Sequence, residues 1–268
     1  MYEEIAQRLL EAYDKAATVD PISATVEDFD MPAAYAVLDH IAARREHAGW
    51  VRVGRKIGFT NATLWDLYGV DRPMWAHVWS ETVVHAEGNV AELSLDRFVQ
   101  PRIEPEVVFK LRTEPPSTDD PTEVLRAVEW MAPGFEIVHC HFPEWRFTLA
   151  DCTADFALHG ALVVGTPVAV DGDNVDAAAE ALPTFELALS RGTAVVDRGV
   201  GSNVLGGPAH ALTHLIRVLD DGPESSRLTG GELVTTGTLT DAWPIAAGEQ
   251  WTSDYGRLGL GGLTITFA

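Results

Sequence analysis

Two glutamates separated by one proline, in Glu104-Pro105-Glu106, are residues whose spacing suggests chemistry. On a strand, residues i and i+2 point to the same side, so both carboxylates would face one place. Two carboxylates that close repel each other unless a proton or a metal lies between them. Pro105 cannot donate a ladder hydrogen bond, which suits a sheet edge or the mouth of a site. The alternative interpretation is a pair of solvated surface glutamates.

A third carboxylate, Glu136, lies inside the apolar run Gly134-Phe135-Glu136-Ile137-Val138. A lone buried carboxylate is strongly unfavourable unless it is paired or bound to a metal, whereas a solvent-facing one on a half-exposed strand is not. Three carboxylates without a local basic partner suit a hard divalent cation, Mg²⁺ or Mn²⁺, with water completing its coordination. The pattern therefore indicates a candidate metal site.

Lys56 is the basic residue that could serve such a site. It lies in Gly54-Arg55-Lys56-Ile57-Gly58, where a lysine near a strand end between glycines can contact a bound anion. The alternative is an ordinary lysine that lays its alkyl stem along apolar surface.

The histidines suggest zinc less convincingly. His139-Cys140-His141 would place two imidazoles on one strand face, and His210 and His214 have helical i,i+4 spacing. Ala211 follows His210 where the metalloprotease motif has glutamate, and the chain has no CxxC pair. We therefore reject zinc. The glycine-rich segment 201–208 matches neither a P-loop nor a dinucleotide fingerprint.

The elements that must position these residues fall into two regions. Apolar residues at helical spacing predict helices across residues 1–49, with Asp30 as an N-cap and Gly49 after the second helix. From Trp50 onward, short apolar runs divided by glycine and proline predict strands. We expect an α+β fold, a helical region (1–49) on a β-rich body (50–268), in one compact unit.

Further elements are expected within the β-rich body. Helices are predicted from Thr60 or Asn61 to Gly69, from Asp120-Pro121 to a point before Pro133, and over Pro208–Leu219. Strands are predicted over Phe135–His139, in a hairpin that turns at Arg191-Gly192, and through Glu232–Phe267. Residues 113–122 and 220–226 are expected to be surface loops.

Charge and composition exclude several classes of function. The 268-residue chain carries a net charge of -21, which disfavours nucleic acid and anionic membranes as partners. Two cysteines are too few for a disulfide scaffold, and the N-terminus lacks the pattern of a signal peptide. No uninterrupted apolar stretch is long enough to span a bilayer. We expect a cytoplasmic protein.

In order along the chain, several segments resemble the 2-keto-4-pentenoate hydratase and 4-oxalocrotonate decarboxylase branch of the fumarylacetoacetate hydrolase superfamily. The resemblance covers about Gly54 to Phe267, and it is the ordered set of landmarks that is specific. These landmarks are Gly54-Arg55-Lys56-Ile57-Gly58-Phe59-Thr60, Gly69-Val70-Asp71-Arg72-Pro73, Gln100-Pro101-Arg102-Ile103-Glu104-Pro105-Glu106, Phe135-Glu136-Ile137-Val138, Leu205-Gly206-Gly207-Pro208 and Thr236-Gly237-Thr238-Leu239.

The resemblance implies a helical N-terminal region on a mixed β-roll or barrel of the fumarylacetoacetate hydrolase type. It implies Mg²⁺ or Mn²⁺ held by Glu104, Glu106 and Glu136, and a 2-oxo acid or dienol substrate that reacts through a metal-stabilised enolate. Lys56 would bind or protonate the substrate, and Arg102 would help to hold it. A homo-oligomer, or a complex with a related lyase, is also implied.

The chain departs from the hydratase pattern at two places. Met74 stands where hydratase-like members usually carry aspartate, and Asp155-Phe156-Ala157-Leu158-His159 replaces an Asp-Asn-Ala-Ser-Ser run. Leu158, at a position expected to contact substrate, cannot move protons. Decarboxylation or enol–keto tautomerisation needs less acid–base apparatus than water addition. His159 is the candidate proton donor, or else a packed structural histidine. Trp75, Trp79, Trp145 and Phe156 could line a pocket, although aromatics more often pack in the core.

The sequence therefore predicts a metal-dependent lyase of the hydratase/decarboxylase group. One alternative is a hydrolase that cleaves a C–C bond of an acylpyruvate, although no clear Glu-His pair is present to activate water. The others are an enol–keto tautomerase and a catalytically retired binding or assembly partner.

Overall fold

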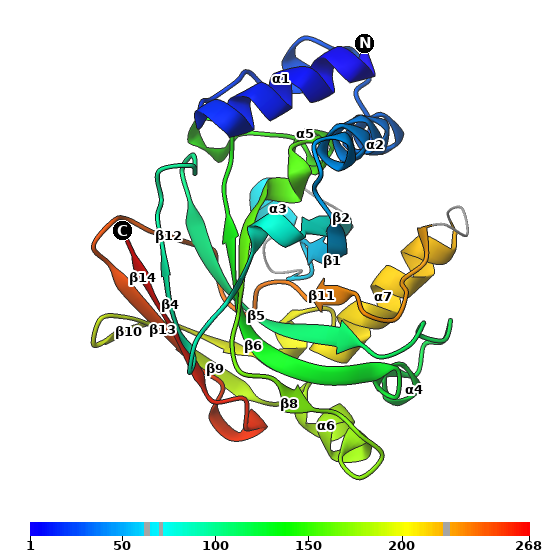
Figure 1. Cartoon of the computed structure of the whole chain (residues 1–268), viewed down its shortest axis with the longest axis vertical. Coiled ribbons are helices and arrows are strands. Elements are labelled where there is room, and N and C mark those ends of the chain that lie inside the picture. Colours follow the sequence, from blue (N-terminus) through cyan, green and yellow to red (C-terminus); the bar gives the residue numbers. More distant parts are fainter. Residues whose placement is uncertain (62–64, 70–71, 222–225) are drawn as a thin grey trace.

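The computed structural model describes residues 1–61, 65–69, 72–221 and 226–268 (Figure 1). The predicted landmark residues Val70 and Asp71, the start of the predicted helix after Asn61 and part of the predicted loop 220–226 lie outside these ranges. Among the described residues, no helix is both long and apolar enough to cross a bilayer.

Two N-terminal helices form a layer at one end of the molecule (Figure 1). Asp30 caps the second helix as predicted, because its side chain accepts from the Ala33 N–H, and Gly49 follows that helix with a φ of 92°. The helices are α1 (Tyr2–Lys15), α2 (Met31–His47), α3 (Trp65–Tyr68), α4 (Pro121–Leu125), α5 (Leu149–Ala154), α6 (Val175–Ala181) and α7 (Pro208–Asp220).

The rest of the chain is built mainly on two sheets. The larger has the strand order β2-β1-β11-β5-β6-β7-β3, with β12 paired to β5 and β8 to β6, and the smaller has the order β10-β9-β13-β14-β4. The strands are β1 (Arg52–Gly58), β2 (Met74–Trp79), β3 (Val83–His85), β4 (Val90–Leu93), β5 (Arg102–Leu111), β6 (Val128–Val138), β7 (His159–Val164), β8 (Val168–Ala169), β9 (Glu186–Arg191), β10 (Ala194–Val200), β11 (Leu233–Thr235), β12 (Trp243–Pro244), β13 (Gln250–Asp254) and β14 (Gly262–Phe267).

The larger sheet curls into a half-barrel with two different faces (Figure 1). On one face, β5 contributes Val107 and Phe109 to the main core, which also contains Trp251 and Ile265 of the smaller sheet. On the other face lie Val108 and the glutamates, because side chains alternate along a strand. The α+β architecture predicted from the sequence is confirmed.

Most predicted elements are present with shifted ends. The hairpin turns at Gly192, which has a φ of 57°, and α7 spans the predicted helix. The strand predicted from Phe135 instead begins at Val128 and includes Pro133. Pro133 lies where the partner of β6 changes from β7 to β8, so a residue without an N–H is tolerated there.

Candidate metal centre and its pocket

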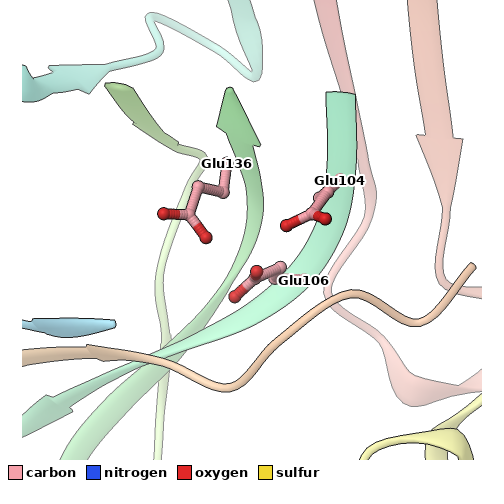
Figure 2. Close-up of side chains that lie close together, drawn as sticks. All are labelled: Glu104, Glu106 and Glu136. Carbon is pink, nitrogen blue, oxygen red and sulfur yellow. The ribbon is translucent and has the colours of Figure 1, made fainter. Parts of the chain in front are cut away.

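Glu104, Glu106 and Glu136 converge on one point of the curled sheet (Figure 2). Glu104 pairs directly with Glu136 across β5 and β6, and Glu106 follows two residues later on the same face. One carboxylate oxygen from each lies within 4.8 Å of the other two. The antiparallel register therefore assembles the triad from two strands.

The three carboxylates are in an environment that favours a cation. Burial, with repulsion from Glu136, raises the pKa of Glu104 to about 7 and raises the pKa of Glu106 well above its usual range. Oε1 of Glu106 is buried and accepts no hydrogen bond, and Oε2 of Glu136 is buried with the Lys56 ammonium 3.3 Å away. With all three carboxylates ionised and Lys56 charged, two negative charges are left, which one divalent ion would neutralise. The residues present therefore fit a hard divalent cation.

Lys56 lies beside the triad, on β1. Its Nζ donates to the carbonyl oxygen of Ala157 at 2.9 Å and lies 3.3 Å from Oε2 of Glu136. Burial alone would lower the pKa of Lys56, but the three glutamates raise it, so the side chain stays an ammonium. Gly58 makes room for it, because a Cβ there would meet Met74 at 2.4 Å and Nζ of Lys56 at 3.3 Å.

His159 contacts the triad through Glu136. Its Nδ1 lies 2.7 Å from Oε1 of Glu136, and its Nε2 lies 2.8 Å from the hydroxyl of Thr82. Burial lowers the pKa of His159, although the contact with Glu136 opposes that shift. A neutral ring that donates from Nδ1 would orient Glu136. His159 is absent from the pocket lining, so its predicted role as proton donor stays a prediction without direct support from this geometry.

A pocket of about 520 Å³, including its open mouth, adjoins the triad. The titratable side chains that line it, among the described residues, are those of Lys56 and Glu104. Its other wall residues are mainly apolar and include Ile57, Phe59, Met74, Val138, Trp145, Phe147, Leu158 and Ala242. Of the aromatics considered from sequence, only Trp145 is among these lining residues, and the guanidinium of Arg102 lies 4.0 Å from its ring centre.

Gly237 and Thr60 add polar groups to the site; both belong to landmark segments of the sequence but were not predicted as site residues. The N–H of Gly237 donates to Oε2 of Glu106 at 2.9 Å. Gly237 has a φ of 93°, and a Cβ there would lie 1.7 Å from the hydroxyl of Thr60. Glycine is therefore required at this position. The buried Thr60 hydroxyl has no hydrogen-bond partner and belongs to a residue of the pocket wall, where a ligand could use it.

The segment that carries Leu158 has an unusual backbone. Phe156, Ala157 and Leu158 have φ values of 56°, 49° and 62°, so three successive residues with side chains are left-handed. Each such residue is disfavoured by roughly 1–2 kcal/mol relative to the right-handed form. This left-handed turn gives Lys56 its carbonyl partner and gives the pocket one wall.

Two of the histidines discounted as zinc ligands, His139 and His141, have structural partners. Nδ1 of His141 lies 2.6 Å from Oδ1 of Asp155, and His139 packs against His141 with ring centres 4.5 Å apart. Within the described ranges, the glutamate triad is the one group of potential metal ligands whose atoms converge.

The chain is similar to known proteins along its full length. It is 31% identical over 268 residues to 2-hydroxyhexa-2,4-dienoate hydratase of Comamonas testosteroni, covering 99% of this chain and 97% of the relative. It superposes on 4-oxalocrotonate decarboxylase of Pseudomonas putida G7, solved with magnesium and adipate, with a TM-score of 0.88 at 23% identity, covering 100% of this chain and 97% of that one.

A more distant likeness extends the comparison. Fumarylpyruvate hydrolase of Pseudomonas aeruginosa, solved with Mn²⁺ and pyruvate, matches with a TM-score of 0.61 at 15% identity, covering 81% of this chain and 90% of that one. No protein-family model matches the chain.

Proposed function

Because this chain belongs to the 2-keto-4-pentenoate hydratase and 4-oxalocrotonate decarboxylase branch of the fumarylacetoacetate hydrolase superfamily, we propose that Glu104, Glu106 and Glu136 hold Mg²⁺ beside a 2-oxo acid substrate. The protein is a divalent-metal-dependent lyase of the hydratase/decarboxylase group, and its substrate is a small molecule. The observation that carries the assignment is the convergence of three buried or half-buried carboxylates, one of which, Glu104, lines the pocket.

The proposal of a hard divalent cation, Mg²⁺ or Mn²⁺, follows from the ligands. Carboxylate oxygens are hard donors, and no nitrogen or sulfur atom of the described residues joins the cluster. Mn²⁺ has similar preferences and serves as a spectroscopic substitute. A divalent ion bound there would supply Lewis acidity to the 2-oxo group of the substrate.

Lys56 is proposed to bind the substrate. Its ammonium has three donors, of which one reaches Ala157 and a second faces Glu136. The third is available for a substrate carboxylate in the pocket that Lys56 lines. Arg102, beside Trp145, is proposed to help hold the substrate, and Leu158 to contact its apolar part.

Between the two lyase reactions, we favour decarboxylation. Addition of water needs a base, and the titratable groups of the described wall are a charged lysine and a proposed metal ligand. In decarboxylation the C–C bond to the leaving carboxylate breaks and its electron pair enters the conjugated 2-oxo system. The product carbon then takes a proton, for which Lys56 is the charged donor among the described residues of the pocket wall. Hydration remains the second candidate, because the hydratase relative is 31% identical over its length.

A matched substrate pair tests the proposal. One dienol carries a single carboxylate and the other has the same carbon chain with a second, distal carboxylate. Loss of ultraviolet absorbance and release of CO₂ are followed with Mg²⁺ and with EDTA. We expect Mg²⁺-dependent consumption, with CO₂ from the dicarboxylate. Consumption of the monocarboxylate without CO₂ would indicate hydration if the product has gained the mass of water, and enol–keto tautomerisation if its mass is unchanged. Metal binding without turnover of either compound would contradict the lyase assignment and favour the retired relative.

Several expectations from the sequence stay predictions. These are a cytoplasmic location, a homo-oligomer or a complex with a related lyase, and the division at residue 49 into a helical region and a catalytic domain. Size-exclusion chromatography with light scattering would measure the assembly.

A further inference from the structure

The left-handed turn at Phe156–Leu158 must be held in place by its surroundings. Residues with side chains disfavour this conformation, and three in succession persist only where neighbouring contacts determine them. Within the turn, the Leu158 N–H donates to the Asp155 carbonyl at 2.8 Å, and the Leu158 carbonyl accepts from the His139 N–H at 2.9 Å. These bonds leave the side chain of Phe156 to be fixed by other elements.

Arg45 of α2 supplies that contact. Its guanidinium lies 4.8 Å from the ring centre of Phe156, 4.4 Å from that of Tyr13 and 3.8 Å from that of Trp50. The rings of Tyr13 and Phe156 are themselves 5.0 Å apart. The N-terminal helices therefore reach the turn through one cation surrounded by three aromatic rings.

The placement of Arg45 is unfavourable for a residue that only fills space. The residue is 5% exposed, and no carboxylate of the described residues lies within ion-pair distance of it. Desolvating a guanidinium is costly, and aromatic faces recover part of that loss. A leucine or methionine would fill such a site at lower cost.

A second contact fixes the same segment from the N-terminal region. The backbone N–H and the hydroxyl of Ser23 donate to the Asp151 carboxylate at 2.8 and 2.6 Å. Asp151 belongs to α5, which leads directly into the turn, and it also forms a capping box with Thr148. Both ends of the segment from α5 to Leu158 are thus anchored outside the curled sheet.

We propose that Arg45 is a positioning residue. Its contact with the ring of Phe156 keeps the left-handed turn in place, and the turn positions Lys56 through the carbonyl oxygen of Ala157. Arg45 itself does not line the pocket. The N-terminal helices would then be part of the catalytic apparatus. The kinetic consequence rests on the proposed function, whereas the effect on the turn does not.

Hydrogen–deuterium exchange of the intact protein tests directly whether Arg45 stabilises the left-handed turn. Arg45→Met keeps the alkyl stem and removes the cation. Amide exchange in a peptide covering residues 155–159 should rise about tenfold, because a desolvated cation–π cluster is lost. Arg44→Met is the matched control: Arg44 also joins α2 to α1, through Glu3 at 3.0 Å and Gln7 at 2.8 Å. It should leave that peptide unchanged.

A double-mutant cycle then tests whether Arg45 acts through the turn. Glycine adopts positive φ readily, so in Ala157→Gly the left-handed turn should depend less on the contact between Arg45 and Phe156. Arg45→Met should lower kcat/KM about tenfold in the natural background and clearly less in the Ala157→Gly background. Mn²⁺ affinity should stay unchanged, because Arg45 does not contact the triad. Arg45→Lys, which keeps a cation over the rings, should lose less kcat/KM than Arg45→Met. If Arg45→Met does not fold, Arg45→Lys is used in its place.

The outcomes separate the two claims. Unchanged exchange at 155–159 in a folded Arg45 variant, or equal losses of kcat/KM in both backgrounds, would overturn the positioning role. A natural protein that turns over no 2-oxo acid would refute the proposed function, while the exchange measurement would still decide whether Arg45 holds the turn.

Discussion

The ammonium of Lys56 lies 3.3 Å from the carboxylate of Glu136, and the two side chains are 3% and 0% exposed. A buried pair of this kind is sensitive to the removal of one partner. Glu136 also contacts His159 on its other oxygen, at 2.7 Å. The three glutamates therefore have different roles in stability, although they share one proposed role as metal ligands.

Glu136→Gln should destabilise the metal-free protein, by about 3 kcal/mol, because it leaves the buried Lys56 ammonium without the carboxylate that forms its ion pair. Glu106→Gln should be neutral or stabilising, because it removes a carboxylate that its neighbours repel. Urea unfolding in EDTA measures both. Equal loss of stability in the two variants would contradict this difference.

The stability of the metal-free protein should fall as pH rises from about 4.5 to about 7. The pKa of Glu104 is raised from 4.5 to about 7, so in this window the folded state binds more protons than the unfolded state. Stability then decreases with pH. Added Mg²⁺ should stabilise the protein more as pH rises through the same window, because protons compete for Glu104. Thermal unfolding with EDTA or Mg²⁺ tests this, and Glu104→Gln should reduce the slope.

Lys56→Met should lower turnover by about 10²–10³-fold, a loss typical of removing one group that stabilises developing charge. Mn²⁺ affinity should be retained or should rise, because a positive charge 3.3 Å from Glu136 is removed. Steady-state kinetics and Mn²⁺ titration provide the two readings. Normal kinetics in this variant would exclude the substrate role of Lys56.

Substitutions of His159 distinguish two roles that this residue could have, positioning Glu136 or donating a proton. If it orients Glu136, His159→Ala should weaken metal binding about 10–100-fold, and His159→Asn should recover part of that affinity through its amide donor. A proton donor would instead lose kcat by about 10²–10⁴-fold at unchanged metal affinity, with no recovery in the asparagine variant. The contact with Glu136 predicts the first pattern.

The sequence predicted the convergence of the three glutamates on two separate grounds, while their role as metal ligands stays a proposal. Period-two alternation on a strand places Glu104 and Glu106 together, and the structure has them on one face of β5. Nothing local pairs Glu136 with them, since register between distant strands is a long-range property. That part of the prediction came from the ordered landmarks of a family, and the likeness to the hydratase relative confirms the family.

The contacts that hold the site residues in place could not be predicted from the sequence in the same way. Arg45 looks like one more charge near the end of a helix, and only the packing of α1, α2 and the turn brings it to Phe156. Likewise, Thr82 gives no sequence signal of its contact with His159. Three left-handed residues in a row oppose local preference, so tertiary contacts alone could reveal them.

The most direct test of the metal assignment is a Mg²⁺ titration of the EDTA-treated protein, read as consumption of a dienol substrate. Turnover should rise from background to a plateau in the natural protein and in Glu123→Gln, an exposed-glutamate control paired with Arg126. Glu106→Gln should remain at background over the same range. Full turnover in EDTA, or a normal plateau in Glu106→Gln, would contradict a catalytic divalent ion held by this triad.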